Sequence, residues 1–274
     1  MHSGDKMEHE PLVSVIIPTY NSSKTIEKCL KSVEDQTYKN IEIIVFDNYS
    51  SDKTIELVTR FDVNVFFAST TTPGGKNLGI SKSNGQFLLF VDSDMILERN
   101  VVEECVRLSS NDEEIIGIII AERSVGSGFW VRVRDFERSF YAGTDIESAR
   151  FFIKKYVTLV EGYDETIIGH EDSTLPNKLQ DQGFNVKGRI SSYILHCEEG
   201  INFIERLHKA RRYSLTRRLY YKKYRKYAKK QDNILRRLDL FFTNGNWKML
   251  LRHPVLSVGM LTLKTLEYLF SLRL

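Results

Sequence analysis

Two acidic turns follow directly after apolar runs in the first third of the chain. Asp47 follows the run 41–46, and Asp92-Ser93-Asp94 follows the run 87–91. Two carboxylates on either side of one residue can hold a hard divalent cation, which in turn binds diphosphate oxygens. An isolated pair of this kind is more often a solvated turn with a helix cap. Because this pair ends an apolar strand, Asp92, Ser93 and Asp94 form a candidate phosphate and metal site.

The turn from Asp47 to Asp52 is a second candidate. A carboxylate directly after a buried strand can accept a hydrogen bond from a nucleobase imide, and we assign this role to Asp47. Asp52 and Thr54 have the residue types of an ordinary turn and helix cap, so we interpret them as structural.

Three further positions carry residue types that suit transfer chemistry. Gly74 and Gly75 let the backbone approach a ligand, and Lys76 beside them can meet phosphate, with Asn77 next to it. Glu171-Asp172 opens a predicted helix, where a carboxylate is stabilised in its charged form and suits a general base. Simple capping explains the same residues. His196 is a possible metal ligand, although a lone histidine is more often structural.

The elements that must position these residues alternate in type. Short apolar runs predict strands at 13–18, 41–46, 63–68, 87–91 and 115–121, and apolar spacing predicts helices between them. Such alternation indicates a mainly parallel sheet with helices on both faces, which is an α/β fold. Ligands bind at the carboxyl ends of parallel strands, where both acidic turns fall. We expect mixed helix and loop over 121–156 and a helix over 172–182.

Bulk composition limits the class of protein. With 274 residues, 42% of them hydrophobic, the chain can form one sizeable core with a helical appendage. The three cysteines are odd in number and show no CxxC spacing, so we expect a reducing compartment rather than a disulfide framework. The N-terminus has no apolar signal core, and no run approaches the roughly 20 apolar residues that span a bilayer. These features favour a cytoplasmic protein.

The order of the motifs is more specific than any one of them. Val13–Asn21, the Asp47 turn, Lys76–Ile80, Asp92–Asp94, Glu161–Glu165 and Glu171-Asp172 follow one another. This series resembles the family 2 glycosyltransferases of the GT-A fold, over about Pro11 to Arg212. The resemblance implies a Rossmann-like catalytic domain over 11–200 and a helical C-terminal extension over 201–274.

The resemblance also implies a role for each matching residue. Pro18, Thr19 and Tyr20 would line the nucleotide pocket and Asp47 would read the base. Lys76, with Asn77, stands where the family usually has arginine; it keeps the charge and loses the bidentate fork. Asp94, Asp92 and His196 would hold Mn²⁺ or Mg²⁺, with Ser93 and Asp92 near the donor. Asp172 would be the catalytic base of an inverting transfer and Glu171 its supporting neighbour. The expected donor is a nucleotide sugar, with uridine the usual base.

The charge distribution of the C-terminal region predicts an anionic binding partner. Arg206 to Lys230 contains twelve Lys or Arg and no Asp or Glu, interleaved with tyrosines, and an apolar tail follows. A basic aromatic helix before an apolar one suits the inner face of a membrane, near a glycan or polyprenol-linked acceptor. A helical cap packed on the core, or an oligomer contact, explains the same pattern. Nothing else in the chain supports a nucleic-acid partner.

Two other classes remain to be weighed. A nucleotidyltransferase, a dehydrogenase or a P-loop enzyme needs a glycine-rich turn after the first strand, and the turn from Pro18 to Asn21 has no glycine. A binding module for nucleotide sugars or membrane surfaces that has lost catalysis is the main alternative. The joint presence of Asp92, Asp94 and Asp172 argues against it.

Overall fold

The computed structural model describes residues 10–144, 146–199, 203–231, 233–243 and 245–271. Within these ranges, eight strands form one sheet in the order β3-β2-β1-β4-β7-β6-β8-β5. The strands are β1 (Val13–Thr19), β2 (Ile41–Asp47), β3 (Asn64–Phe67), β4 (Phe87–Phe90), β5 (Met95–Leu97), β6 (Gly117–Val125), β7 (Ala149–Ile153) and β8 (Gly188–Cys197).

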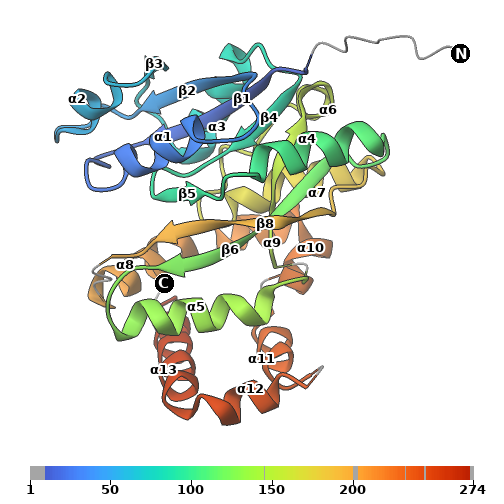
Figure 1. Ribbon diagram of the computed structural model, residues 1–274. Coiled ribbons are helices and arrows are strands. Elements are labelled where there is room, and N and C mark those ends of the chain that lie inside the picture. Colours follow the sequence, from blue (N-terminus) through green and yellow to red (C-terminus); the bar gives the residue numbers. More distant parts are fainter. Residues whose placement is uncertain (1–9, 145, 200–202, 232, 244, 272–274) are drawn as a thin grey trace, which may run out of the picture.

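The predicted mainly parallel α/β sheet is confirmed. β1 is parallel to both β2 and β4, β2 to β3, and β6 to β8. Three pairings are antiparallel, namely β4–β7, β6–β7 and β5–β8. Figure 1 shows the strands running through the middle of the molecule, with helices around them.

Helices cover both faces of the sheet because the central strands are apolar on both sides. One core joins Val13, Val15 and Ile17 of β1 to buried faces of α1 and α4. The other joins Ile16 of the same strand to α3, α6 and α7. The helices involved are α1 (Ile26–Glu34), α2 (Thr54–Val58), α3 (Thr72–Lys82), α4 (Val101–Asn111), α6 (Lys154–Leu159) and α7 (Glu171–Asp181).

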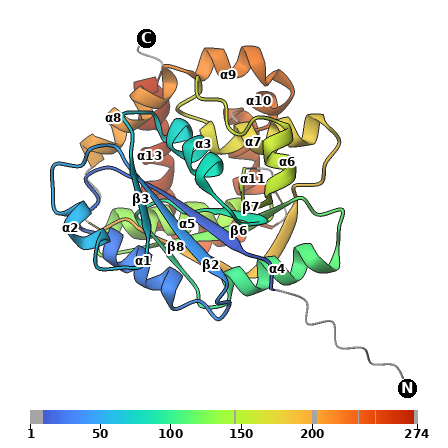
Figure 2. The ribbon, with the colours of Figure 1, turned by 90° about the horizontal axis from the view of Figure 1, so that it is seen from above.

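The remaining helices pack outside these layers and are drawn in green to red in Figure 1. They are α5 (Phe129–Tyr141), α8 (Phe203–Ser214), α9 (Arg217–Lys223), α10 (Arg225–Gln231), α11 (Ile234–Phe242), α12 (Trp247–Arg252) and α13 (Pro254–Ser271). An apolar cluster joins α5, α11 and α13. Seen from above in Figure 2, α8, α9 and α10 lie along the same side of the molecule as α7.

The segment 121–156 contains more regular structure than we expect from its sequence. β6 continues to Val125, α5 follows, and β7 inserts between β4 and β6. The sequence hides β7 because Arg150 interrupts its apolar run. That arginine is buried, and acidic side chains from other elements compensate its charge.

The basic C-terminal segment packs against the core through its tyrosines. Tyr220, Tyr224 and Tyr227 are buried with Ile167, while the lysines around them face outward. His170 stacks on Tyr220 with 4.6 Å between ring centroids, which ties this segment to the start of α7. Within the described ranges, no helix is both long and apolar enough to cross a membrane.

Candidate active site

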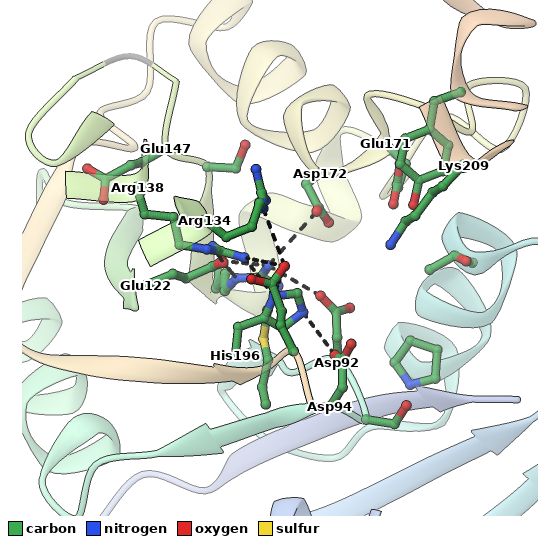
Figure 3. A pocket seen from close by; sticks show the side chains of 18 of the residues that line it. Asp92, Asp94, Glu122, Arg134, Arg138, Glu147, Glu171, Asp172, His196 and Lys209 are labelled. Carbon is green, nitrogen blue, oxygen red and sulfur yellow. Dashed lines mark hydrogen bonds and ion pairs between the residues drawn. The ribbon is translucent and has the colours of Figure 1, made fainter. Parts of the chain in front are cut away.

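A cavity of about 740 Å³ opens at the carboxyl ends of β1 and β4. One side of it comes from the β1, β2 and α3 region, and the opposite side from α5, α8 and α13. Nine of the predicted site residues line it: Pro18, Thr19, Tyr20, Asp92, Ser93, Asp94, Glu171, Asp172 and His196. Figure 3 shows Asp92, Asp94 and His196 on one side of this space, with Asp172 facing them.

Asp94 and His196 are brought together by the sheet. Met95 of β5 pairs with His196 of β8, so the residue before β5 lies next to the imidazole. The distance between Asp94 Oδ1 and His196 Nε2 is 3.1 Å. Burial alone would raise the pKa of Asp94, but the contact with His196 lowers it below its usual value. The other imidazole nitrogen lies 2.6 Å from the Arg138 guanidinium.

This pair fits a divalent cation. Two ligand atoms that each lie about 2.1 Å from one cation, at a right angle, are about 3 Å apart. The observed 3.1 Å between Asp94 and His196 is compatible with that separation and is also an ordinary hydrogen-bond distance. The carboxylate suits Mg²⁺ or Mn²⁺, and the imidazole suits transition metals. The described residues contain no cluster of three or more acidic, histidine or cysteine side chains placed to hold one ion.

Asp92 faces cations instead. Its carboxylate lies 3.3 Å from the Arg150 guanidinium and 4.0 Å from the Lys76 ammonium. The backbone of this turn is held by β5, since the amide of Met95 donates to the carbonyl of Asp92. Ser93 is hydrogen-bonded to the hydroxyl of Ser22, 2.7 Å away. The Asp-Ser-Asp turn is therefore fixed from three directions.

Lys76 and Arg150 join Asp92 to Asp172. The Lys76 ammonium donates to Asp172, and Arg150 lies 4.0 Å from the other oxygen of that carboxylate. Burial alone would lower the pKa of Lys76, but Asp172 and Asp92 raise it well above its usual value, so the side chain is a fixed cation. Lys76 is fully buried and lies beneath the cavity rather than on its wall. Its predicted contact with a diphosphate remains a prediction.

Asn77 holds the segment before α7. Its side-chain amide donates to the carbonyl of Tyr163 at 3.0 Å and to Glu165 at 2.8 Å, and its oxygen accepts from the Tyr163 amide. These bonds fix the loop that leads to Glu171 and Asp172. Asn77 itself is not among the residues that line the cavity.

Asp47 organises the turn after β2. Thr19 donates its hydroxyl to Asp47 at 2.9 Å, and the amide of Ser50 donates at 2.7 Å. The carboxylate is buried, while its neighbours Phe46 and Asn48 line the cavity. Asp52 accepts from the Thr54 amide at 2.9 Å and from the Ser23 amide at 3.1 Å, so its contacts are structural, but Lys53 rather than Asp52 stands at the N-cap of α2.

Glu171 differs from its neighbour Asp172 in its surroundings. Burial, and then the negative charge of Asp172, raise the pKa of Glu171 to about 8. The raised pKa favours the protonated form of Glu171, which can donate a hydrogen bond. Figure 3 shows it beside Lys209, on the opposite side of the cavity from Arg138 and Glu147.

Sequence reasoning missed the charged network on the side of the cavity that β6, α5, α8 and α13 form. We call this side the far wall. Glu122 of β6 accepts from Arg150 and Arg138; burial alone would raise its pKa, but both guanidinium groups bring it below its usual value. Beyond it, ion pairs link α5, the residue after β8, α8 and α13. The residues involved are Arg134, Glu137, Glu198, Arg206, Lys264 and Glu267. The C-terminal region thus forms part of the same cavity. The sign of this network in the sequence is Arg150, a charged residue inside an apolar run.

Comparisons with known proteins agree with this geometry. The profile described as Glycosyl transferase family 2 matches residues 14–165, more than half of the 274 residues. The chain therefore belongs to glycosyl transferase family 2. It is 38% identical over 99 residues to the glycosyltransferase GlyG of Streptococcus pneumoniae, which covers 34% of this chain and 33% of GlyG. The chain thus spans about a third of that relative's length.

Solved structures support the GT-A fold. A mannosyltransferase from Pyrobaculum calidifontis in complex with GDP-Man and Mn²⁺ aligns with a TM-score of 0.68 and 16% identity, covering 97% of this chain and 88% of that one. S. aureus TarS 1–349 in complex with UDP-GlcNAc aligns with a TM-score of 0.56 and 19% identity, covering 75% of this chain and 66% of that one. The predicted fold class and family are confirmed.

Proposed function

We propose that this protein transfers a sugar from a nucleoside diphosphate sugar to an acceptor hydroxyl, with inversion at the anomeric carbon and Asp172 as general base. One observation carries the proposal: the Asp94–His196 pair and Asp172 face one cavity, and Lys76 and Arg150 connect Asp172 to Asp92. The donor would lie between the nucleotide side of the cavity and this centre.

Asp172 takes the proton from the acceptor hydroxyl while the hydroxyl oxygen attacks the anomeric carbon. The bond from that carbon to the diphosphate oxygen breaks, and the nucleoside diphosphate leaves. A single displacement of this kind converts an α-linked donor into a β-linked product. A well-placed base contributes about 10²- to 10⁴-fold to the rate. Lys76 and Arg150 hold Asp172 in position and balance its charge before the proton arrives.

Asp94 and His196 would hold Mn²⁺ or Mg²⁺, with Asp92 close by. When bound, that ion would offset the charge of the leaving diphosphate. Pro18, Thr19 and Tyr20 would contact the nucleotide, and Asp47 would orient the turn that recognises its base. A uridine nucleotide is the proposed donor; GDP-Man and UDP-GlcNAc are the donors named for the two structural neighbours.

The proposed acceptor is a glycan or a lipid-linked sugar at the cytoplasmic face of a membrane. The charged far wall supports a hydroxyl-rich acceptor, because fixed carboxylate and guanidinium groups can hydrogen-bond sugar hydroxyls. Arg134 and Glu137 on α5, and Lys264 and Glu267 on α13, are the groups placed there.

The test measures binding and turnover of UDP-, GDP- and dTDP-sugars, with and without Mn²⁺. Wild type is compared with Asp94→Ala, Asp172→Asn and the exposed control Asp112→Ala. One nucleotide sugar should bind more tightly with Mn²⁺, and Asp94→Ala should lose that gain. Asp172→Asn should bind the donor yet lose transfer, by at least about 10²-fold. Failure of every nucleotide sugar to bind would overturn the proposal and favour the non-catalytic surface-binding module.

A further inference from the structure

An exposed apolar surface lies at the corner between α12 and α13. We call it the α12–α13 corner. Its members are Trp247 (47% exposed), Leu251 (70%), Val255 (69%) and Val258 (65%). Figure 1 shows these helices below α5, at the end of the molecule farthest from β2 and β3. The active-site proposal leaves this surface unused.

The corner is separate from the apolar core beside it. On α13, Met260 and Leu263 are buried and pack against Val133 and Phe136 of α5, which secures the helix to the rest of the protein. Val255 and Val258 on the same helix stay exposed. The helix therefore does not need these two side chains in order to fold against α5.

A shallow apolar hollow of about 500 Å³ adjoins the corner between α5 and α13. Its lining consists of Phe129, Trp130, Pro254, Val255, Val258, Gly259 and Thr262. Gly259 lets the two helices approach, because a Cβ there would lie 2.7 Å from the ring of Phe129. The hollow extends the apolar surface onto α5.

The surroundings of the corner are basic. Lys248 and Arg252 are exposed on α12, and Arg132 is exposed on α5. Residues 246–262 contain no aspartate or glutamate. The two tryptophans of the chain, Trp130 and Trp247, both belong to this surface. Tryptophan and cations around an apolar patch suit the interface of an anionic membrane.

The basic helices α9 and α10 offer a different surface. Lys229 and Lys230 are exposed, but Tyr220, Tyr224 and Tyr227 face the protein core. That face can attract anions, but its large aromatic side chains are already buried. Side chains that insert into the apolar part of a membrane would therefore come from another surface of the C-terminal region.

We propose that the α12–α13 corner inserts into the interfacial layer of an anionic lipid membrane, with Lys248, Arg252 and Arg132 at the headgroups. Val258 and Lys264 lie six residues apart on α13, so the helical rise of 1.5 Å per residue places the far wall of the cavity roughly 9 Å along the helix. Membrane contact at the corner thus brings the acceptor side of the cavity close to the lipid. Only this last consequence depends on the proposed function.

The experiment measures co-sedimentation of the full chain with vesicles of phosphatidylcholine alone, or with 30% phosphatidylglycerol. Tryptophan fluorescence follows insertion. Leu251→Ser tests the corner, and Leu159→Ser on α6 is its matched control, because Leu159 is 64% exposed. Lys248→Gln with Arg252→Gln tests the corner charges. Lys229→Gln with Lys230→Gln tests the other basic surface.

Wild type should bind the anionic vesicles with a blue shift of fluorescence. Leu251→Ser should lower the vesicle partition coefficient more than tenfold, since each buried methylene group contributes about fourfold. Removal of each corner cation should lower it about fivefold. The Leu159→Ser control should bind as wild type does.

Three outcomes would overturn the inference. They are absence of binding to anionic vesicles, equal binding by Leu251→Ser, and loss of binding only in the Lys229→Gln, Lys230→Gln variant. A change in oligomeric state in Leu251→Ser without vesicles would instead assign the corner to a second copy of the chain. Nucleotide-sugar binding is measured separately on the same variants, so failure of the proposed function and failure of membrane docking are distinguishable.

Discussion

Replacement of Lys76 by methionine tests the central electrostatic feature of the site. Lys76 is fully buried and contacts Asp172, and its ammonium lies 4.0 Å from Asp92. Methionine keeps most of the volume and removes the charge. The two carboxylates then face each other with Arg150 as the remaining nearby cation.

The size of the effect follows from charge and exposure. Removal of one partner from a buried ion pair costs about 3–5 kcal/mol. Because the Asp172 side chain is 37% exposed and keeps part of its hydration, we expect about 3 kcal/mol loss of unfolding free energy. At 4 Å and an effective dielectric constant of 20, a unit charge pair is worth about 4 kcal/mol, which is of the same order.

The assay has two parts. Denaturant unfolding gives the stability of Lys76→Met, and sugar transfer or donor hydrolysis gives its activity. Activity should fall, because Lys76 no longer holds Asp172 in position. The control Lys82→Met removes an exposed cation from the same helix and should change neither quantity. Unchanged activity in Lys76→Met, with stability equal to wild type, would refute this account.

The remaining predictions concern Glu171 and the glycines of α3. The pKa of Glu171 is raised to about 8, first by burial and then by Asp172, so the folded state keeps a proton that the unfolded state releases from about pH 4.5 upward. Stability should therefore fall between these values, and unfolding at pH 5 and 8.5 should show Glu171→Gln gaining on wild type as pH rises; parallel profiles would contradict this. Gly79→Ala should destabilise by about 1–3 kcal/mol in thermal or denaturant unfolding, because its Cβ would lie 2.3 Å from a methyl of Ile16. Gly75→Ala, whose Cβ would have its nearest neighbour at 3.7 Å, is the matched control and should be at least as stable as wild type.

Local patterns predicted the nucleotide side of the sheet well. The apolar runs that become β1, β2 and β4 are buried on both faces, so each needs little information from the rest of the chain. Because parallel strands end at the same edge, the turns after β2 and β4 had to lie together. The helix that begins at Glu171 was equally predictable from the sequence. Pro176 lies in its first turns, and Gly183, at a φ of +86°, lies just past its end.

The far wall could not be predicted in this way. Arg150 contradicts a local strand pattern, and it is compatible with β7 only because Glu122, Asp92 and Asp172 arrive from three other elements. The contact of Lys76 with Asp172 spans 96 residues, which no local pattern encodes. The tyrosine spacing from Tyr220 to Tyr227 suited an exposed aromatic face and a buried stripe equally, and the structure has the buried stripe.

The pairing of β5 with β8 has a consequence for how the protein reaches its native state. β5 is only three residues long, and its described partner strand begins at Gly188, almost a hundred residues later. Contacts of such long sequence separation form late, because a large loop must close before they gain energy. We therefore expect Asp94 and His196 to meet late in folding. When Asp94 of a nascent chain has left the ribosome, His196 has not yet been synthesised. In the native state, local opening of this short edge strand would separate Asp94 from His196 again without unfolding the rest of the sheet.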